Sequence, residues 1–136
     1  MIDLRAKSAA VLMGIAGVLS ACRQASGPPD CSDPPRISEF AINVAVRDSL
    51  TGLPAARGTT VIARDGAYSD SVTIPAAGFD QLLIGLAFNR IGTYSVTARK
   101  DGYVDWVKTG VQVTTGLCGI DGQLITARLR PAPPRN

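Results

Sequence analysis

Residues 40–47 read Phe-Ala-Ile-Asn-Val-Ala-Val-Arg, and this stretch decides the class of fold. Phe40, Ile42, Val44 and Val46 occupy every second position, with smaller or polar residues between them. A period of two is typical of a β-strand that buries one face and exposes the other. The stretch therefore predicts a half-buried strand.

Similar segments follow at intervals of about ten residues. Val61 and Ala63 precede Asp65-Gly66, a strong hairpin signal, and Asp101-Gly102 predicts another turn. No apolar run keeps the helical period of 3.6 across ten positions bounded by caps. The pattern predicts an all-β fold: a seven- or eight-stranded antiparallel β-sandwich after a cleaved N-terminal signal helix. After the first strand, we expect strands through 61–63, 68–74, 81–88, 93–100, 104–109, 111–114 and 123–129.

The apolar positions also predict which side chains are buried. Leu82, Ile84 and Leu86 should share one face of their strand, as should Tyr94, Val96 and Ala98 of theirs. All seven aromatic residues lie between Phe40 and Trp106, which places the predicted core within those limits.

Composition excludes several kinds of chemistry. The chain has 136 residues and no histidine. It therefore lacks Ser-His-Asp and Cys-His nucleophile pairs, histidine zinc sites and any imidazole base. We predict no enzyme, no catalytic residue, no metal site and no cofactor.

Net charge says little about partners. Lys and Arg number 14 against 11 Asp and Glu, a formal net charge of +3. The basic residues form no run of five or six that would follow a phosphate backbone. A nucleic-acid partner is not expected.

The first 22 residues predict the compartment. Two cations, Arg5 and Lys7, precede 15 uncharged residues, 8–22, which are rich in Ala, Val, Leu, Ile and Gly. As a helix this segment would span roughly 22 Å, short of the roughly 30 Å hydrocarbon core of a bilayer. A cleaved leader over 1–21 is therefore expected rather than a permanent span.

The leader ends in Leu19-Ser20-Ala21-Cys22, which resembles the lipobox of bacterial lipoproteins. The resemblance implies that Cys22 is acylated and becomes the new N-terminus, so that a lipid bilayer is a partner. An ordinary secretory leader cut after Ala21 is the alternative. In that family an aspartate after the cysteine often favours inner-membrane retention. Arg23 at this position implies the outer membrane rather than the inner membrane of the cell envelope.

The cysteine count fits the same interpretation. Lipidation of Cys22 leaves Cys31 and Cys118, which we predict to form a disulfide in an oxidising compartment. Two free thiols or metal ligation are the alternatives, although no CxxC spacing exists and two thiolates alone make a poor zinc site.

Proline marks the predicted boundaries. Residues 22–36 contain Pro28-Pro29 and Pro34-Pro35 among small and polar residues, which predicts a flexible tether. Residues 132–136 are expected to be a disordered tail. The predicted domain spans 37–131.

Three segments resemble the carboxypeptidase regulatory-like domain: 46–54 (VRDSLTGLP), 91–98 (IGTYSVTA) and 100–103 (KDGY). The resemblance implies a transthyretin-like seven-stranded sandwich that acts as an accessory or interaction module without catalysis. Physically, Gly52 suits a turn that needs a positive φ, and Tyr94 and Tyr103 are expected to pack into the sandwich.

Two functions remain open at this point. The first is protein interaction or structural support in the envelope, with an envelope protein as partner. The alternative is binding of carbohydrate, such as peptidoglycan or exopolysaccharide, on an aromatic platform of Tyr103 and Trp106. Core packing is the competing role for Trp106, because the only tryptophan of a small domain is more often buried.

Overall fold

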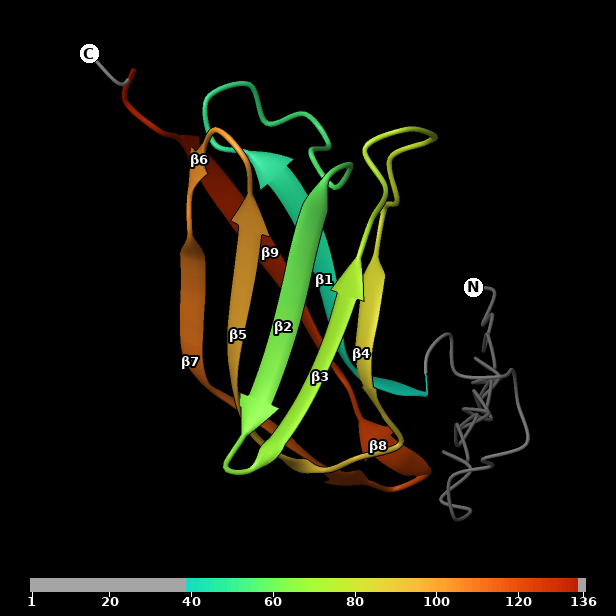
Figure 1. Ribbon diagram of the computed structural model, residues 1–136. Coiled ribbons are helices and arrows are strands. Elements are labelled where there is room, and N and C mark those ends of the chain that lie inside the picture. Colours follow the sequence, from blue (N-terminus) through green and yellow to red (C-terminus); the bar gives the residue numbers. More distant parts are fainter. Residues whose placement is uncertain (1–38, 135–136) are drawn as a thin grey trace, which may run out of the picture.

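The structure, a computed structural model, describes residues 39–134, and these form two curled β-sheets packed face to face (Figure 1). This part of the chain contains nine strands, one or two more than expected. They are β1 (Phe40–Asp48), β2 (Thr59–Asp65), β3 (Tyr68–Thr73), β4 (Ile84–Phe88), β5 (Gly92–Lys100), β6 (Tyr103–Val104), β7 (Trp106–Gly116), β8 (Gly119–Asp121) and β9 (Gln123–Pro131). The predicted all-β sandwich is confirmed, and residues 39–134 hold no helix long and apolar enough to cross a membrane.

The smaller sheet has the order β4-β1-β9-β6 and the larger one the order β3-β2-β5-β7-β8. The expectation of a purely antiparallel sandwich is wrong at one place, because β1 and β9 run parallel from Ile42↔Gln123 to Asp48↔Leu129. Alternating polarity within a strand does not encode the direction of its neighbour. The first and last strands of the described domain thus lie side by side in the middle of the smaller sheet.

The predicted hairpin after Ala63 is present as β2–β3. Asp65 pairs with Tyr68, and Gly66 and Ala67 form the two-residue loop between them. Gly66 has a φ of 56°, whereas Ala67 has no positive φ. A glycine at the first central position is what a type II′ turn requires, and the twist of such a turn matches that of the two strands.

The core lies between the two sheets, and alternate residues of most strands enter it. Tyr94 is the largest fully buried side chain, and its hydroxyl donates to the carbonyl oxygen of Arg90 at 2.9 Å. The core extends past the predicted limit at Trp106. Beyond that limit it includes Val111 and Val113 of β7 and Ile125, Ala127 and Leu129 of β9.

The observed strands differ from the predicted ones at three places. The predicted strands 104–109 and 111–114 are not separate, because β7 continues from Trp106 through Gly110 to Gly116. β4 starts only at Ile84, and the side chain of Leu82 is 75% exposed rather than buried with Ile84 and Leu86. The predicted strand 104–109 is divided at Asp105, because β6 pairs with β9 in the smaller sheet and β7 pairs with β5 in the larger one. The chain therefore passes from one sheet to the other at Asp105.

Phe40 lies on the outer surface at the beginning of the smaller sheet. Its ring packs edge-on against Phe88 with the ring centroids 5.5 Å apart. A Cβ atom on Gly85 would come within 2.5 Å of that ring. Gly85 is therefore required for Phe40 to lie flat on β4.

Gly85→Ala should lower the free energy of unfolding by about 1–3 kcal/mol, because the new methyl group displaces the Phe40 ring. Denaturant titration measures this change. Gly116→Ala is the matched control, since a Cβ there meets its neighbours at an ordinary 3.5 Å. The explanation fails if Gly85→Ala is as harmless as the control, or if it costs as much in a Phe40→Ala background as in the native chain.

Candidate functional site

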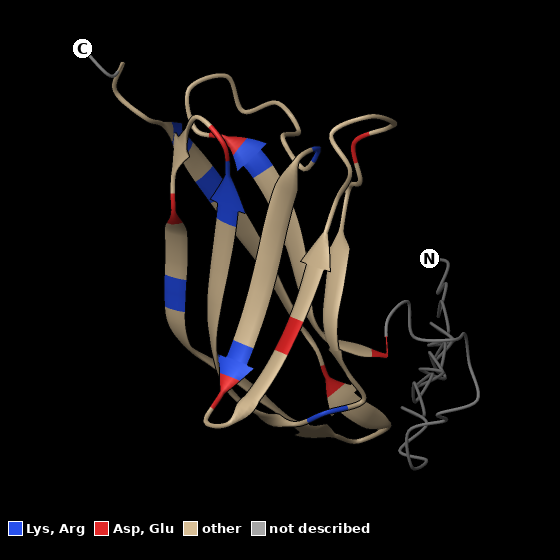
Figure 2. Cartoon of the chain, viewed as in Figure 1, with Lys and Arg blue, Asp and Glu red and all other residues tan. Residues whose placement is uncertain are grey.

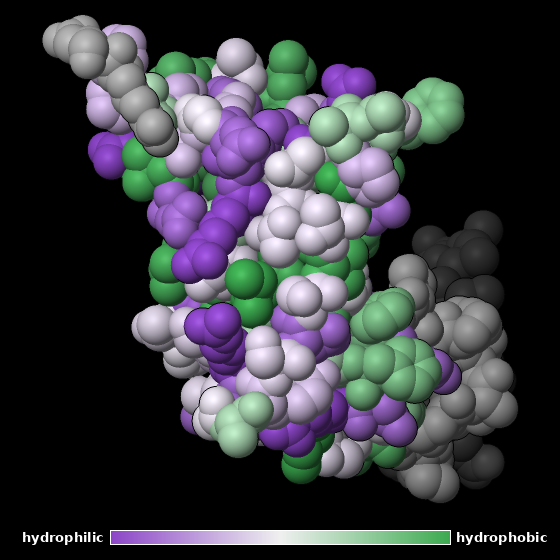
Figure 3. Space-filling view, viewed as in Figure 1, coloured by the Kyte–Doolittle hydropathy of each residue, from purple (hydrophilic) through white to green (hydrophobic). Residues whose placement is uncertain are grey.

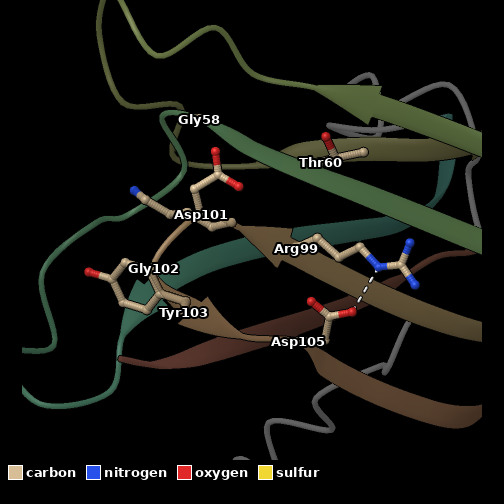
Figure 4. A pocket seen from close by; sticks show the side chains of 8 residues that line it. Gly58, Thr60, Arg99, Asp101, Gly102, Tyr103 and Asp105 are labelled. Atoms are coloured by element: carbon tan, nitrogen blue, oxygen red, sulfur yellow. Dashed lines mark hydrogen bonds and ion pairs between the residues drawn. The ribbon is translucent and has the colours of Figure 1, made fainter. Parts of the chain in front are cut away.

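The turn between β5 and β6 borders an open polar hollow with a volume of about 430 Å³ (Figure 4). Its walls come from the start of β2, the end of β5, the turn itself, β6 and the residue between β6 and β7. The lining residues are Gly58, Thr60, Arg99, Lys100, Asp101, Gly102, Tyr103 and Asp105.

The hollow owes its shape to the Asp101-Gly102 turn, which was predicted correctly. Gly102 has a φ of 79°, and its carbonyl oxygen accepts a hydrogen bond from the backbone N–H of Ala132 at 2.8 Å. The Nζ of Lys100 donates to the carbonyl oxygen of Ala55 at 3.0 Å and lies 5.5 Å from the centroid of the Tyr103 ring. The turn is thus connected to the β1–β2 loop and to the residue that follows β9.

Tyr103 connects the hollow to a tight turn after β1. Its hydroxyl donates to Oδ2 of Asp48 at 2.9 Å, while Oδ1 accepts from the backbone N–H groups of Leu50 and Thr51. The hydrogen bond from the Thr51 N–H, followed by those from Tyr103 and Leu50, lowers the pKa of Asp48 below its ordinary 3.8. The same contact with Asp48, together with burial, raises the pKa of Tyr103 above 10.0.

The remaining charged groups of the hollow are exposed. Arg99 donates from Nε to Oδ2 of Asp105 at 2.8 Å, the dashed line in Figure 4. The Thr60 hydroxyl bonds to the hydroxyl of Thr73 rather than to a base. These residues offer hydrogen-bond donors and acceptors to a small polar molecule, and the lining contains no paired nucleophile and base.

The two residues of the predicted platform, Tyr103 and Trp106, lie on strands of different sheets. Tyr103 belongs to β6 in the smaller sheet and Trp106 to β7 in the larger one. Both side chains are partly buried against the core, and Trp106 is absent from the lining of the hollow. The chain changes sheets between these two residues, at Asp105.

The two predicted cysteine roles, lipidation of Cys22 and a disulfide between Cys31 and Cys118, stay predictions. Cys22 and Cys31 lie outside the described residues, and no disulfide joins two residues of the described part. Cys118 is disulfide-bonded, but the residue that pairs with it is not among those described. Residues 39–134 contain no group of three or more Cys, Asp or Glu side chains that could hold a metal ion.

Sequence reasoning missed the role of Asp48 beside Tyr103. An aspartate three residues before Thr51 signals a side-chain turn, so the local half of the contact was available from the sequence. The other half joins residues 55 positions apart and depends on how β1 and β6 flank β9.

Comparison with known proteins adds no relative. No known family matches the chain, and no curated protein matches it significantly.

Asp48→Asn should destabilise the domain at neutral pH and have progressively less effect in acid. Because the pKa of Asp48 is lowered in the folded state, its stabilising contribution is complete above the unfolded value near 3.8. The contribution is lost as the pH falls through the folded value. Free energies of unfolding of both proteins, measured from pH 2.5 to 7, test this. A deficit as large at pH 2.5 as at pH 7 would contradict it.

The fluorescence of Trp106, the only tryptophan, should report packing rather than ligand binding. We expect an emission maximum that is blue-shifted relative to the unfolded chain and that stays constant when oligosaccharides are added. A saturable shift or quench on addition of oligosaccharide would show that this side chain contacts sugar after all.

Proposed function

We propose that this protein is a non-enzymatic lipoprotein of the cell envelope, anchored through acylated Cys22. Its β-sandwich acts as a module for protein interaction or structural support. The outer membrane is the favoured site because Arg23 follows the cysteine. The partner would be an envelope protein, in addition to the bilayer that holds the lipid.

The observation that carries this proposal is where the folded domain begins and ends. The described strands run from Phe40 to Pro131, within the predicted domain of 37–131 and after the leader and the proline-rich segment. An acyl anchor, a tether and one folded module are the parts that a lipid-anchored accessory protein needs. The order of leader, tether and folded domain supports the proposal without reference to a ligand-binding or catalytic site.

Likeness to carboxypeptidase regulatory-like domains gives further support. All three segments that resemble this family include turns or strands of the sandwich, and Gly52 has the positive φ, 72°, expected for its turn. Tyr94 is buried in the core as expected. A finer assignment to the transthyretin-like group is part of the proposal.

Carbohydrate binding receives less support. The two aromatic residues that would stack on a sugar ring pack against the core from different sheets. The Tyr103 hydroxyl is already hydrogen-bonded to Asp48.

The anchor can be tested by expressing the whole chain in a bacterial host and fractionating the cells. The native chain should sediment with membranes, and its intact mass should equal that of residues 22–136 plus acyl chains. Cys22→Ser should remove the acyl mass and release the protein from the membrane fraction. A native chain that stays in the cytosol with its leader attached and its thiols reduced would overturn the proposal.

A further inference from the structure

Three arginines project from the outer face of the smaller sheet. Arg47 of β1 is directly paired with Arg128 of β9, and Arg130 lies two residues further along β9, paired with Val104 of β6. Side chains alternate along a strand, and each arginine is exposed and directly follows a buried residue, Val46, Ala127 or Leu129, so all three arginines face outward. Figure 2 shows the basic segments of β1 and β9 at the same end of the sheet. We call this surface the arginine face; its outward residues are Gly85, Asn43, Ala45, Arg47, Leu124, Thr126, Arg128, Arg130 and Val104.

The positive charge of the arginine face is not neutralised within the described residues. The ion pairs of that part of the chain use Arg57, Arg90 and Arg99 instead. Arg47 donates to the carbonyl oxygen of Gly52 at 2.9 Å, and no carboxylate stands among the outward residues of the face. Like charges on directly paired strand positions destabilise a sheet. An anionic surface placed against the face would remove that repulsion.

The other end of the same face is apolar. The ring of Phe40 lies over Gly85 of this face and forms its edge-on pair with Phe88, which is 58% exposed. Leu124, which is paired with Asn43, is 69% exposed. The distance along β9 from Leu124 to Arg128 is four residues, roughly 13 Å, so one flat surface can contact both ends at once.

We propose that the arginine face docks on an anionic lipid bilayer. The arginines would bind headgroup phosphates, and Phe88 and Leu124 would enter the boundary between headgroups and acyl chains. Guanidinium groups pair well with phosphate, and a surface that combines cations with exposed apolar side chains suits a membrane interface.

The proposal rests on the proposed function in one respect, the acyl anchor at Cys22. Seventeen residues separate Cys22 from Phe40, so the anchor can lie at most roughly 60 Å from the start of β1. A tether of this length gives the domain a high effective concentration at the bilayer, where a weak docking surface suffices.

The opposite face has a different character. In Figure 3 purple and white areas cover much of the larger sheet, with green patches between them. Its outward positions carry hydroxyl groups in several strands, among them Thr60, Ser69, Ser71, Thr73, Thr93, Ser95 and Thr97. This contrast assigns the membrane contact to the smaller sheet.

The test uses the chain 22–136 with Cys22→Ser, so that no lipid anchor contributes. Binding is measured by sedimentation with vesicles of phosphatidylcholine alone and with vesicles containing 30% phosphatidylglycerol. We expect binding to the anionic vesicles only, weakened by added salt. Arg128→Gln and Arg130→Gln should each reduce the partition coefficient about fivefold, and the double variant about 25-fold. Leu124→Ala should reduce it about fivefold.

Two matched controls separate the face from net charge and from hydrophobicity. Arg64→Gln removes the same charge from the outer side of the larger sheet, and Leu82→Ala shortens an equally exposed leucine in the β3–β4 loop. Both should change binding by less than about twofold, because these positions lie more than a Debye length from the docked bilayer or outside the face. Thermal unfolding of every variant verifies that the fold is intact.

The proposal is overturned if the protein does not bind anionic vesicles, or if the controls weaken binding as much as the variants of the arginine face do. Binding to a soluble anionic polysaccharide but not to vesicles would also overturn it. Because the tested protein carries no acyl group, these outcomes leave the anchor at Cys22 to be decided by fractionation and intact mass.

Discussion

The parallel pairing of β1 with β9 is the constraint on which the rest of the structure depends. Seven consecutive register pairs join the first and last strands of the domain, from Ile42↔Gln123 to Asp48↔Leu129. Bringing these strands together closes a loop of nearly the whole domain, which is entropically costly and gives a fold rich in non-local contacts. Once formed, the pair completes the smaller sheet, buries Ile125, Ala127 and Leu129, and sets Arg47 beside Arg128.

The same pairing positions the polar end of the sandwich. β6 joins the free side of β9 at its C-terminal end, which brings Tyr103 to the end of β1 and to Asp48. Several polar groups around the hollow already have partners: Lys100 bonds to the Ala55 carbonyl, Arg99 to Asp105 and Tyr103 to Asp48. The hollow is therefore best explained as a structural junction, and the surfaces free to contact other molecules are the outer faces of the two sheets.

Local patterns predicted the parts that depend on neighbouring residues. The alternation from Ile42 to Arg47, the turn at Asp65-Gly66 and the burial of Tyr94, Val96 and Ala98 are all present in the structure. The alternation is wrong at the start of β1, where Phe40 is exposed and Ala41 is buried. The same patterns wrongly predicted that Leu82 is buried, because β4 begins only at Ile84. They also placed the end of the core at Trp106, whereas β9 contributes to the core through its pairing with β1. Sequence reasoning singled out Tyr103 and Trp106 as a candidate platform but could not detect that the chain changes sheets between them.

The sequence by itself determined the class of fold, the turns and the absence of histidine chemistry, because side-chain alternation, glycine conformation and composition are properties of the chain. Only the tertiary structure decided which strands pair, in which direction, and which charges meet. Period-two alternation predicts that a residue faces outward but does not predict which strand lies beside it. The meeting of Arg47 with Arg128, and of Asp48 with Tyr103, arises from contacts between positions 81 and 55 residues apart.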